Sequence, residues 1–262
     1  MSPGIHPQPG DAYVQSFARG LEVIRAFSAN APCQTLTEVA SRSGLSRAGA
    51  RRILLTLTHL GYVRNDGKLF SLTPRILDLG FAYLSSMPIW NLAEPVMQAL
   101  VEKVKESCSA AVLDSTDIVY VLRMPTHKIM SISLGVGSRL PAHCTSMGRV
   151  LLSALPEDQL MACLSASSIT ALTRHTLTDT SALLHEIAQV RVQGWSLVDQ
   201  ELEEGLVSMA APIINRAGQT VAALNVSGQA NRTSATIMRD TMLPALLAAA
   251  ATVSGLLGSP HS

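Results

Sequence analysis

Residues 35–61 read TLTEVASRSGLSRAGARRILLTLTHLG and contain two helix signals separated by a turn signal. Thr35 or Thr37 can cap a short first helix, and Gly44 can take the left-handed conformation that ends one. Ser46 can then cap a second helix. That helix carries an apolar stripe at helical spacing: Ala50, Ile53, Leu54, Leu57 and Leu60. The order of cap, turn, cap and stripe predicts a helix-turn-helix.

The flanking residues extend this pattern to a winged helix-turn-helix. Upstream, Ser16 can cap a helix that stops near Pro32. Its apolar residues recur at helical spacing: Phe17, Leu21, Ile24 and Phe27. Downstream, residues 62–65 and 68–72 have strand character, and Asp66-Gly67 between them is a favoured two-residue hairpin loop. This hairpin is the predicted wing.

Polar and basic residues occur where such a domain would meet DNA. Arginine makes bidentate contacts to guanine and ion pairs to phosphate, and a serine at a helix start offers a hydroxyl beside free amides. The candidate DNA contacts are Thr37, Ser46, Arg47, Arg51, Arg52, Arg64 and Lys68. The alternative is a small helical bundle with a solvated basic face, but a bundle does not require the glycine turn and the hairpin in this order.

The charge distribution agrees with one end of the chain meeting a polyanion. The net charge of +1 is uninformative by itself. Before Met87 the chain has nine Lys and Arg against five Asp and Glu, whereas from Met87 onward it has eleven against fourteen. The first part is therefore basic and the second acidic.

Composition and cysteine spacing favour an ordinary cytoplasmic protein with buried thiols. Hydrophobic residues make up 47% of the 262 residues, and charged residues make up 15%. The four cysteines form no metal-ligand or disulfide spacing, so no metal and no cofactor are expected. The apolar stretch 242–257 is interrupted by Pro244 and Gly255 and is judged too short to span a membrane. Residues 1–12 do not resemble a secretory signal.

The sequence predicts four segments: a disordered tail over residues 1–12, the winged helix-turn-helix over 13–73, a linker helix over 74–87, and a larger domain over 88–262. The linker helix is apolar around nearly its whole circumference, which predicts that a partner subunit covers it. The larger domain is predicted to be α+β with a central antiparallel sheet. Its expected strands are 109–114, 117–124, 129–134, 195–199, 206–214 and 219–227. Its expected helices are 89–107, two that begin near Thr145 and Pro156, 179–193, and a long one from Ser234.

Two segments of the larger domain are candidates for ligand contact. Residues 138–155 place a polar run at a helix start, whose free amides can hold a carboxylate, and Arg139 and His143 are attractive charged partners. The alternative is that Thr145 and Ser146 only cap the helix. The second segment, residues 199–208, is acidic and is more simply a solvated loop than a metal site.

Longer stretches of the chain resemble the IclR family of bacterial transcription regulators. The N-terminal runs are SFARGLEVIRAF, LTEVASRSGLSRAGARRILLTLTHLGYV and FSLTPRILDLGFAYLSS. The C-terminal runs are LPAHCTSMGRVLLSAL, GWSLVDQELEEGLVSMAAPI and AALNVSG. Within the family, the sequence most resembles the PcaR/PobR-type branch, whose members control catabolism of aromatic acids. The resemblance covers about residues 14–257.

The resemblance implies a winged helix-turn-helix, a linker helix and a GAF-like effector domain. It also implies homodimers or homotetramers on palindromic double-stranded operators, and a small, aromatic organic acid as effector. Pocket positions carried over from the family are Ser146, Met147, Gly148, Asp199, Leu206, Ser208, Asn225 and Ser227. Independently of the resemblance, Asn225 and Ser227 alternate along a strand and should face the same side.

Two other classes of protein stay open at this point. The first is a ligand-processing enzyme fused to a DNA-binding module, although no catalytic residues are indicated: no dinucleotide-binding glycine loop and no nucleophile elbow are present in the sequence. The second is a GAF-like protein-interaction module whose basic helices contact another protein.

Overall fold

The computed structural model describes residues 13–85, 89–126 and 134–258. These residues divide into two compact units, one within residues 6–86 and the other from residue 87 onward. Each unit has a hydrophobic core of its own. The predicted disordered tail, residues 1–12, lies outside the described residues.

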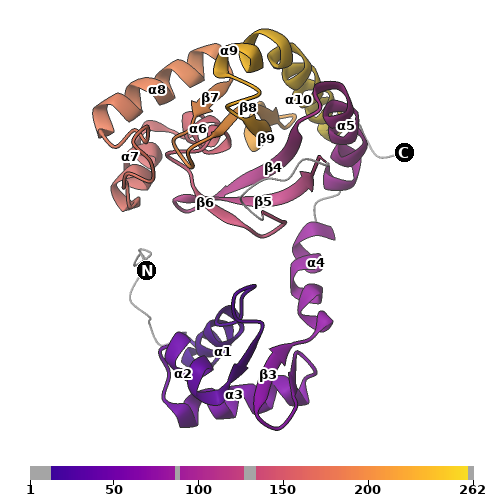
Figure 1. Ribbon diagram of the computed structural model, residues 1–262, viewed down its shortest axis with the longest axis vertical. Coiled ribbons are helices and arrows are strands. Elements are labelled where there is room, and N and C mark those ends of the chain that lie inside the picture. The colour runs from indigo at the N-terminus through magenta and orange to yellow at the C-terminus, as the bar shows by residue number, and fades with distance from the viewer. Residues whose placement is uncertain (1–12, 86–88, 127–133, 259–262) are drawn as a thin grey trace. The chain divides into compact units, whose positions relative to one another are not determined.

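The N-terminal unit combines three helices with a small antiparallel sheet (Figure 1). Its helices are α1 (Gln15–Arg25), α2 (Leu36–Arg42) and α3 (Arg47–His59), and its strands are β1 (Cys33–Thr35), β2 (Val63–Asn65) and β3 (Leu69–Leu72). The strand order is β1-β3-β2, so the sheet has one strand more than the predicted hairpin. The core joins side chains from all three helices and the sheet: Val23, Ala26, Phe27, Val39, Leu54, Leu57, Val63 and Phe70.

Local hydrogen bonds explain where α2 and α3 begin and end. Thr35, rather than Thr37, caps α2: its hydroxyl accepts the Glu38 N–H, and the Glu38 carboxylate accepts the Thr35 N–H at 2.7 Å. After α2, Gly44 has a φ of +66° and turns the chain. Ser46 then caps α3 by accepting the Gly49 N–H at 3.2 Å. The predicted helix-turn-helix is thus confirmed, cap by cap.

Three local predictions were wrong by one or two residues. Ser16 does not cap the first helix, because α1 begins at Gln15 with Val14 as its N-cap. Leu60 is 48% exposed instead of buried, because α3 ends at His59 and Leu60 is its C-cap. The hairpin turn is centred on Gly67 and Lys68, since the Asp66 N–H donates to the Leu69 carbonyl at 3.1 Å. Gly67 has a φ of +103°, a conformation that side chains disfavour, so the turn forms around it.

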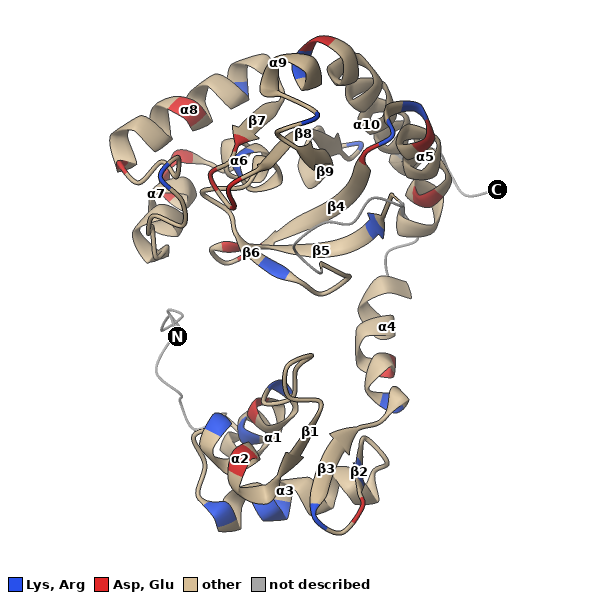
Figure 2. Ribbon diagram, viewed as in Figure 1, with Lys and Arg blue, Asp and Glu red and all other residues tan. Residues whose placement is uncertain are grey.

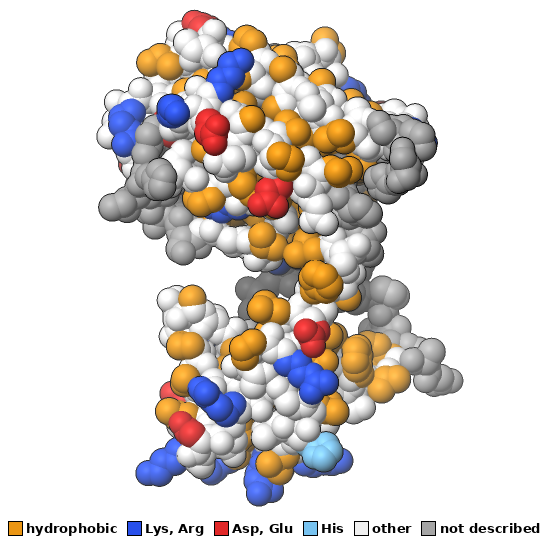
Figure 3. Space-filling view, turned by 90° about the vertical axis from the view of Figure 1, so that its right-hand side faces the viewer, with side chains coloured by type: hydrophobic (Ala, Val, Ile, Leu, Met, Phe, Trp, Pro, Cys, Tyr) orange, Lys and Arg blue, Asp and Glu red, His pale blue; other side chains and the backbone are white. Residues whose placement is uncertain are grey.

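The linker begins with a 3₁₀ turn (Pro74–Ile76) and continues as α4 (Leu77–Ser85). None of the residues of α4 is buried. Its large apolar side chains Leu77, Leu79, Phe81 and Tyr83 are between 46% and 69% exposed. Figure 3 views the side of the molecule on which α4 lies and shows hydrophobic side chains at the surface there.

The C-terminal unit is built on a six-stranded antiparallel sheet (Figure 1). Its strands are β4 (Ser107–Asp114), β5 (Asp117–Met124), β6 (Arg139–Pro141), β7 (Ser196–Asp199), β8 (Leu206–Ile214) and β9 (Thr220–Gln229), in the order β6-β5-β4-β9-β8-β7. Its helices are α5 (Ile89–Val104), α6 (Ser146–Ser153), α7 (Glu157–Ala166), α8 (Thr180–Gln193), α9 (Ala235–Ile237) and α10 (Leu243–Gly258). Helix α6 packs on β4, β8 and β9 beneath α8, and α10 packs on β8 and α5. The predicted α+β class with a central antiparallel sheet is confirmed.

Most of the predicted elements of this unit are present. Strand β6 was not predicted, and of the expected strand 129–134 only Leu134 lies within the described residues, outside any strand. The long last helix begins after Ser234, as predicted, because a π-helical turn (Met238–Met242) joins α9 to α10 without a break. The resulting helix, Ala235–Leu257, is long and apolar enough to cross a membrane by length and composition alone, contrary to the prediction. One side of it packs in the unit, where Leu246 and Val253 are fully buried.

Candidate DNA-binding surface and effector pocket

Helix α3 has one face in the core and an opposite face in solvent. Leu54 and Leu57 are buried, whereas Arg47, Arg51 and Arg52 are exposed. The guanidinium groups of these three arginines form no ion pair and no hydrogen bond with any residue that the structure describes. Their guanidinium groups are therefore available for an external partner.

The acidic side chains nearby are occupied within the unit. Glu38 accepts both the N–H and the hydroxyl of Thr35, and these hydrogen bonds lower the pKa of its carboxyl group. Asp66 accepts the amides of Leu69 and Lys68 in the wing turn, which lowers its pKa as well. Figure 2 shows Lys and Arg along α3 and at the wing. Neither carboxylate forms an ion pair with a lysine or arginine of α3 or the wing among the described residues, so a polyanion would meet these cations without an ion-pair partner.

Arg75 fixes the wing to the end of α3. The Arg75 guanidinium donates to the Leu60 carbonyl at 3.0 Å and stacks over the Tyr62 ring, 5.5 Å from its centroid. Arg64 and Lys68 are exposed on the wing. The predicted DNA contacts thus share one unit, with Ser46 at the start of α3 and the wing anchored to its end.

A small pocket in the C-terminal unit brings together six of the ten predicted effector residues. These six are Ser146, Met147, Leu206, Ser208, Asn225 and Ser227. The pocket is further lined by Tyr120, Leu134, Cys144, Thr145 and Leu202, none of which was among the predicted contacts. Its volume of about 20 Å³ has room for only one water molecule, so the pocket is closed to a larger ligand in this conformation.

The polar groups of the pocket are positioned by the sheet and by α6. Ser208 and Ser227 are directly opposite each other on β8 and β9, and the Ser146 hydroxyl donates to the Ser208 hydroxyl oxygen at 3.0 Å. The Asn225 carbonyl oxygen accepts the Ser109 N–H at 2.9 Å, which leaves the amide NH₂ of Asn225 for the pocket. As predicted, Asn225 and Ser227 line the same cavity.

Arg139 and Asp199 do not line this pocket. Arg139 forms ion pairs with Asp114 and Asp117, because β6 lies beside β5 at the sheet edge. Its side chain is 44% exposed. Asp199 ends β7 and is exposed.

His143 is buried but also does not line the pocket. Its Nε2 atom has no hydrogen-bond partner within the described part of the chain. Burial, together with the positive charge of Arg149, lowers the pKa of the imidazole. The predicted contact of His143 with a carboxylate gains no support from this pocket and stays a prediction.

Gly148 has a packing role rather than a pocket contact. A Cβ atom at this position would overlap the backbone carbonyl of Ala142, so α6 can approach the preceding loop only with glycine here. The next residue, Arg149, is 3% exposed and forms an ion pair with Glu201 at 2.7 Å. It also donates to the His143 carbonyl at 3.1 Å. The motif at the start of α6 therefore holds the pocket wall together.

Glu201 corrects the interpretation of residues 199–208 as a solvated loop. Its carboxylate accepts the Leu177 N–H as well as the Arg149 guanidinium, and its carbonyl oxygen accepts the Thr176 hydroxyl at 2.6 Å. Gln200 beside it has a φ of +61°. The loop that carries Leu202 over the pocket is thus anchored from two sides. Among the described residues no group of three or more His, Cys, Asp or Glu side chains could hold a metal ion.

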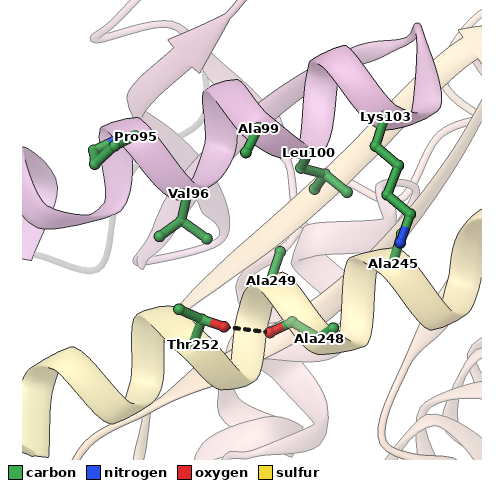
Figure 4. A pocket seen from close by; sticks show the side chains of 9 residues that line it. All are labelled: Pro95, Val96, Ala99, Leu100, Lys103, Ala245, Ala248, Ala249 and Thr252. Atoms are coloured by element: carbon green, nitrogen blue, oxygen red, sulfur yellow. Dashed lines mark hydrogen bonds between the residues drawn. The ribbon is translucent and has the colours of Figure 1, made fainter.

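A second, larger cavity lies between α5 and α10 and has the opposite character (Figure 4). Its volume is about 450 Å³, and its lining is apolar except for Lys103 and Thr252. The Thr252 hydroxyl donates to the Ala248 carbonyl of its own helix at 2.9 Å. This groove lacks the converging polar groups of the smaller pocket, so the smaller pocket is the better candidate for a polar organic ligand.

Two family models cover most of the chain. Residues 81–255 match the C-terminal domain of the bacterial transcriptional regulator IclR, and residues 16–67 match the IclR helix-turn-helix domain. The chain belongs to the IclR family. As an IclR-family protein it is a DNA-binding transcriptional regulator, and the relatives with which it shares the family are named as regulators and not as enzymes.

Two relatives of this IclR-family chain have names that describe what they control. The Pca regulon regulatory protein of Pseudomonas putida is 44% identical over 90% of this chain and 82% of its own length. The p-hydroxybenzoate hydroxylase transcriptional activator of Acinetobacter baylyi is 36% identical over 89% of this chain and 88% of its own length.

Two solved structures share the fold. A transcriptional regulator from Rhodococcus sp. RHA1 is 48% identical, with a TM-score of 0.84 over 94% of this chain and 99% of its own. The inducer-binding domain of a double mutant of PobR from Acinetobacter, in complex with 3-hydroxybenzoic acid, is 32% identical, with a TM-score of 0.60 over 64% of this chain and 98% of its own.

Proposed function

We propose that this regulator controls genes for the catabolism of an aromatic acid, and that an aromatic acid in the pocket beneath α6 modulates its binding to DNA. The observation that carries the proposal is the pocket itself, in which several polar side chains converge beside apolar ones. The proposed effector contacts are Ser146, Met147, Leu206, Ser208, Asn225 and Ser227.

The polar end of the pocket suits a carboxylate. Ser146 and Met147 open α6, and their amides donate to no other described residue, whereas the Gly148 N–H is taken by the Thr145 cap. Free amides and the helix dipole favour a negative charge at this point. The hydroxyl groups of Ser227 and Ser208 and the NH₂ of Asn225 add neutral donors.

The aromatic part of the proposal rests on the relatives. One relative is named for p-hydroxybenzoate hydroxylase, and the PobR inducer-binding domain holds 3-hydroxybenzoic acid. Because the pocket is closed, an acid of this size must displace the loop of Leu202 and Leu206. A bound effector would therefore change the position of a loop that the Arg149–Glu201 ion pair ties to α6.

For the DNA, we propose a palindromic double-stranded operator bound by a homodimer or homotetramer in the cytoplasm. The proposed contacts are Thr37, Ser46, Arg47, Arg51, Arg52, Arg64 and Lys68, all of which are exposed. A second copy of the chain would cover the apolar side chains of α4, since a helix with four large exposed apolar residues is unusual in a monomer.

A thermal-shift screen of the full-length protein with benzoate, hydroxybenzoates and aliphatic acids tests the effector class. A ligand that binds only the folded state raises the melting temperature, by an amount that grows with its concentration. We expect an increase with at least one aromatic acid and none with acetate or succinate. If only aliphatic acids stabilise the protein, the proposal of an aromatic effector is wrong.

A further inference from the structure

The pocket beneath α6 has two chemically different ends. One end has the start of α6 and the polar side chains of β8 and β9, with Asn225 and Ser227 both buried. The other end is at Tyr120 of β5, which β4 separates from β9 in the sheet, and Leu134 also lines the pocket. A ligand with one charged group and a ring would lie with the charge at the first end and the ring toward the second.

Tyr120 reaches this second end from β5. On the sheet it is opposite Ala111 of β4, and Ala111 is in turn opposite Ala223 of β9. All three belong to the cluster of buried residues beneath α6. Because the two neighbours are alanines, the ring of Tyr120 has room to lie over the sheet toward β9.

The hydroxyl group of Tyr120 has no hydrogen-bond partner among the described residues. The side chain is 5% exposed, yet its hydroxyl forms no hydrogen bond with any residue in the described ranges 13–85, 89–126 and 134–258. Buried tyrosine hydroxyls normally find a partner, since leaving one unpaired is costly. Here the side chain lines a cavity, so the missing partner can be supplied from the cavity.

The hydroxyl group also keeps its proton over the physiological range. Burial raises the pKa of Tyr120 to about 12, against a smaller effect of Arg123 in the opposite direction. A neutral phenol both donates and accepts one hydrogen bond, which matches a hydroxyl group on a ligand.

We propose that Tyr120 hydrogen-bonds a ring hydroxyl of the aromatic acid and thereby selects hydroxybenzoates over benzoate. This inference rests on the proposed function, because it takes an aromatic acid as the ligand. Tyr120 was not among the effector contacts predicted from the sequence. With Tyr120 as a contact, the ligand has a defined orientation: its carboxylate lies at Ser227 and the start of α6, and its ring hydroxyl lies at Tyr120.

Isothermal titration of the full-length protein with benzoate, 3-hydroxybenzoate and 4-hydroxybenzoate tests this assignment. The wild-type protein should bind at least one hydroxybenzoate more tightly than benzoate. Tyr120→Phe keeps the ring and removes only the hydroxyl group. It should therefore lower the affinity for that hydroxybenzoate about tenfold, which corresponds to roughly one hydrogen bond, and leave the affinity for benzoate unchanged. Ser227→Ala, at the opposite end of the pocket, should lower the affinity for all three acids by the same factor.

Tyr62→Phe makes the same chemical change in the N-terminal unit and should leave the affinities for the three acids unchanged. The melting temperature of each variant without ligand shows that it is folded. Equal affinities of wild type and Tyr120→Phe for the hydroxybenzoates would overturn the proposal, as would an equal loss for benzoate, which would place the carboxylate at Tyr120. If the wild-type protein binds none of the three acids, the proposed effector class itself fails, and the assignment of Tyr120 fails with it.

Discussion

At the scale of single residues, the motif at the start of α6 separates residues that can touch a ligand from residues that build the wall. Ser146 and Met147 line the pocket, whereas Gly148 and Arg149 face the loop before the helix and the loop of Glu201. A sequence motif combines both kinds because they are consecutive on one helical turn. Substitutions can tell them apart.

Gly148→Ala should destabilise the protein by about 2 kcal/mol or more, because the new methyl group overlaps the Ala142 carbonyl and α6 must shift. Gly255→Ala on α10 is the matched control, since a Cβ atom there meets nothing within 4 Å and alanine favours a helix. Urea unfolding followed by circular dichroism measures both. Equal midpoints for Gly148→Ala and wild type would show that the close approach is not a constraint.

Glu201→Ala should cost about 3 to 5 kcal/mol, because the buried Arg149 guanidinium loses its only acidic partner among the described residues. Glu204→Ala removes a carboxylate from the same loop and is the control. Its contact with Arg174 is 3.6 Å long and exposed, so the expected change is within about 0.5 kcal/mol. If the two variants unfold at the same urea concentration, the buried ion pair does not anchor the loop.

At the scale of elements, periodicity and capping signals predicted α2, α3 and the hairpin well. Ser46 and Gly44 act as local signals whose geometry does not depend on the rest of the chain. The three-residue strands β1 and β6 were missed, because strands this short carry no alternating pattern and form only against a neighbouring strand.

The candidate pocket was predictable only in part. Ser208, Asn225 and Ser227 follow from the family motif, and two of them also follow from strand alternation. Tyr120 does not, because its place opposite Ala111 depends on the register of β4 and β5, which shifts at an irregularity between Ala110 and Ala111. Arg139 was misplaced for a related reason: its ion-pair partners Asp114 and Asp117 are distant in sequence and meet it only through the β5–β6 pairing.

If α3 is the recognition helix, its exposed arginines contact the operator directly. Arg51→Ala should weaken operator binding at fixed salt by at least about tenfold, because one bidentate or phosphate contact is lost per subunit. Arg216→Ala, which removes an exposed arginine from the β8–β9 turn, should leave it unchanged. Fluorescence anisotropy with an operator selected from a random duplex library measures both affinities. An Arg51→Ala variant with wild-type affinity would exclude this face of α3.

At the scale of the whole molecule, the chain divides its tasks between two compact units with separate cores. The first unit has the unpaired arginines of α3, and the second has the closed pocket beneath α6. A regulator needs the two to be coupled, so a ligand in the second unit must change the affinity of the first for DNA. The exposed apolar side chains of α4, the last helix of the first unit in the sequence, are the natural place for a second copy to take part.

The most direct test of this account is the operator affinity of the full-length protein, measured by anisotropy as a hydroxybenzoate is titrated in. We expect the acid to change the operator affinity of the wild-type protein by roughly fivefold or more. Ser227→Ala should bind the operator with wild-type affinity without acid but need a higher acid concentration for the same change. An operator affinity that does not depend on the acid, or identical titrations for the wild type and Ser227→Ala, would contradict it.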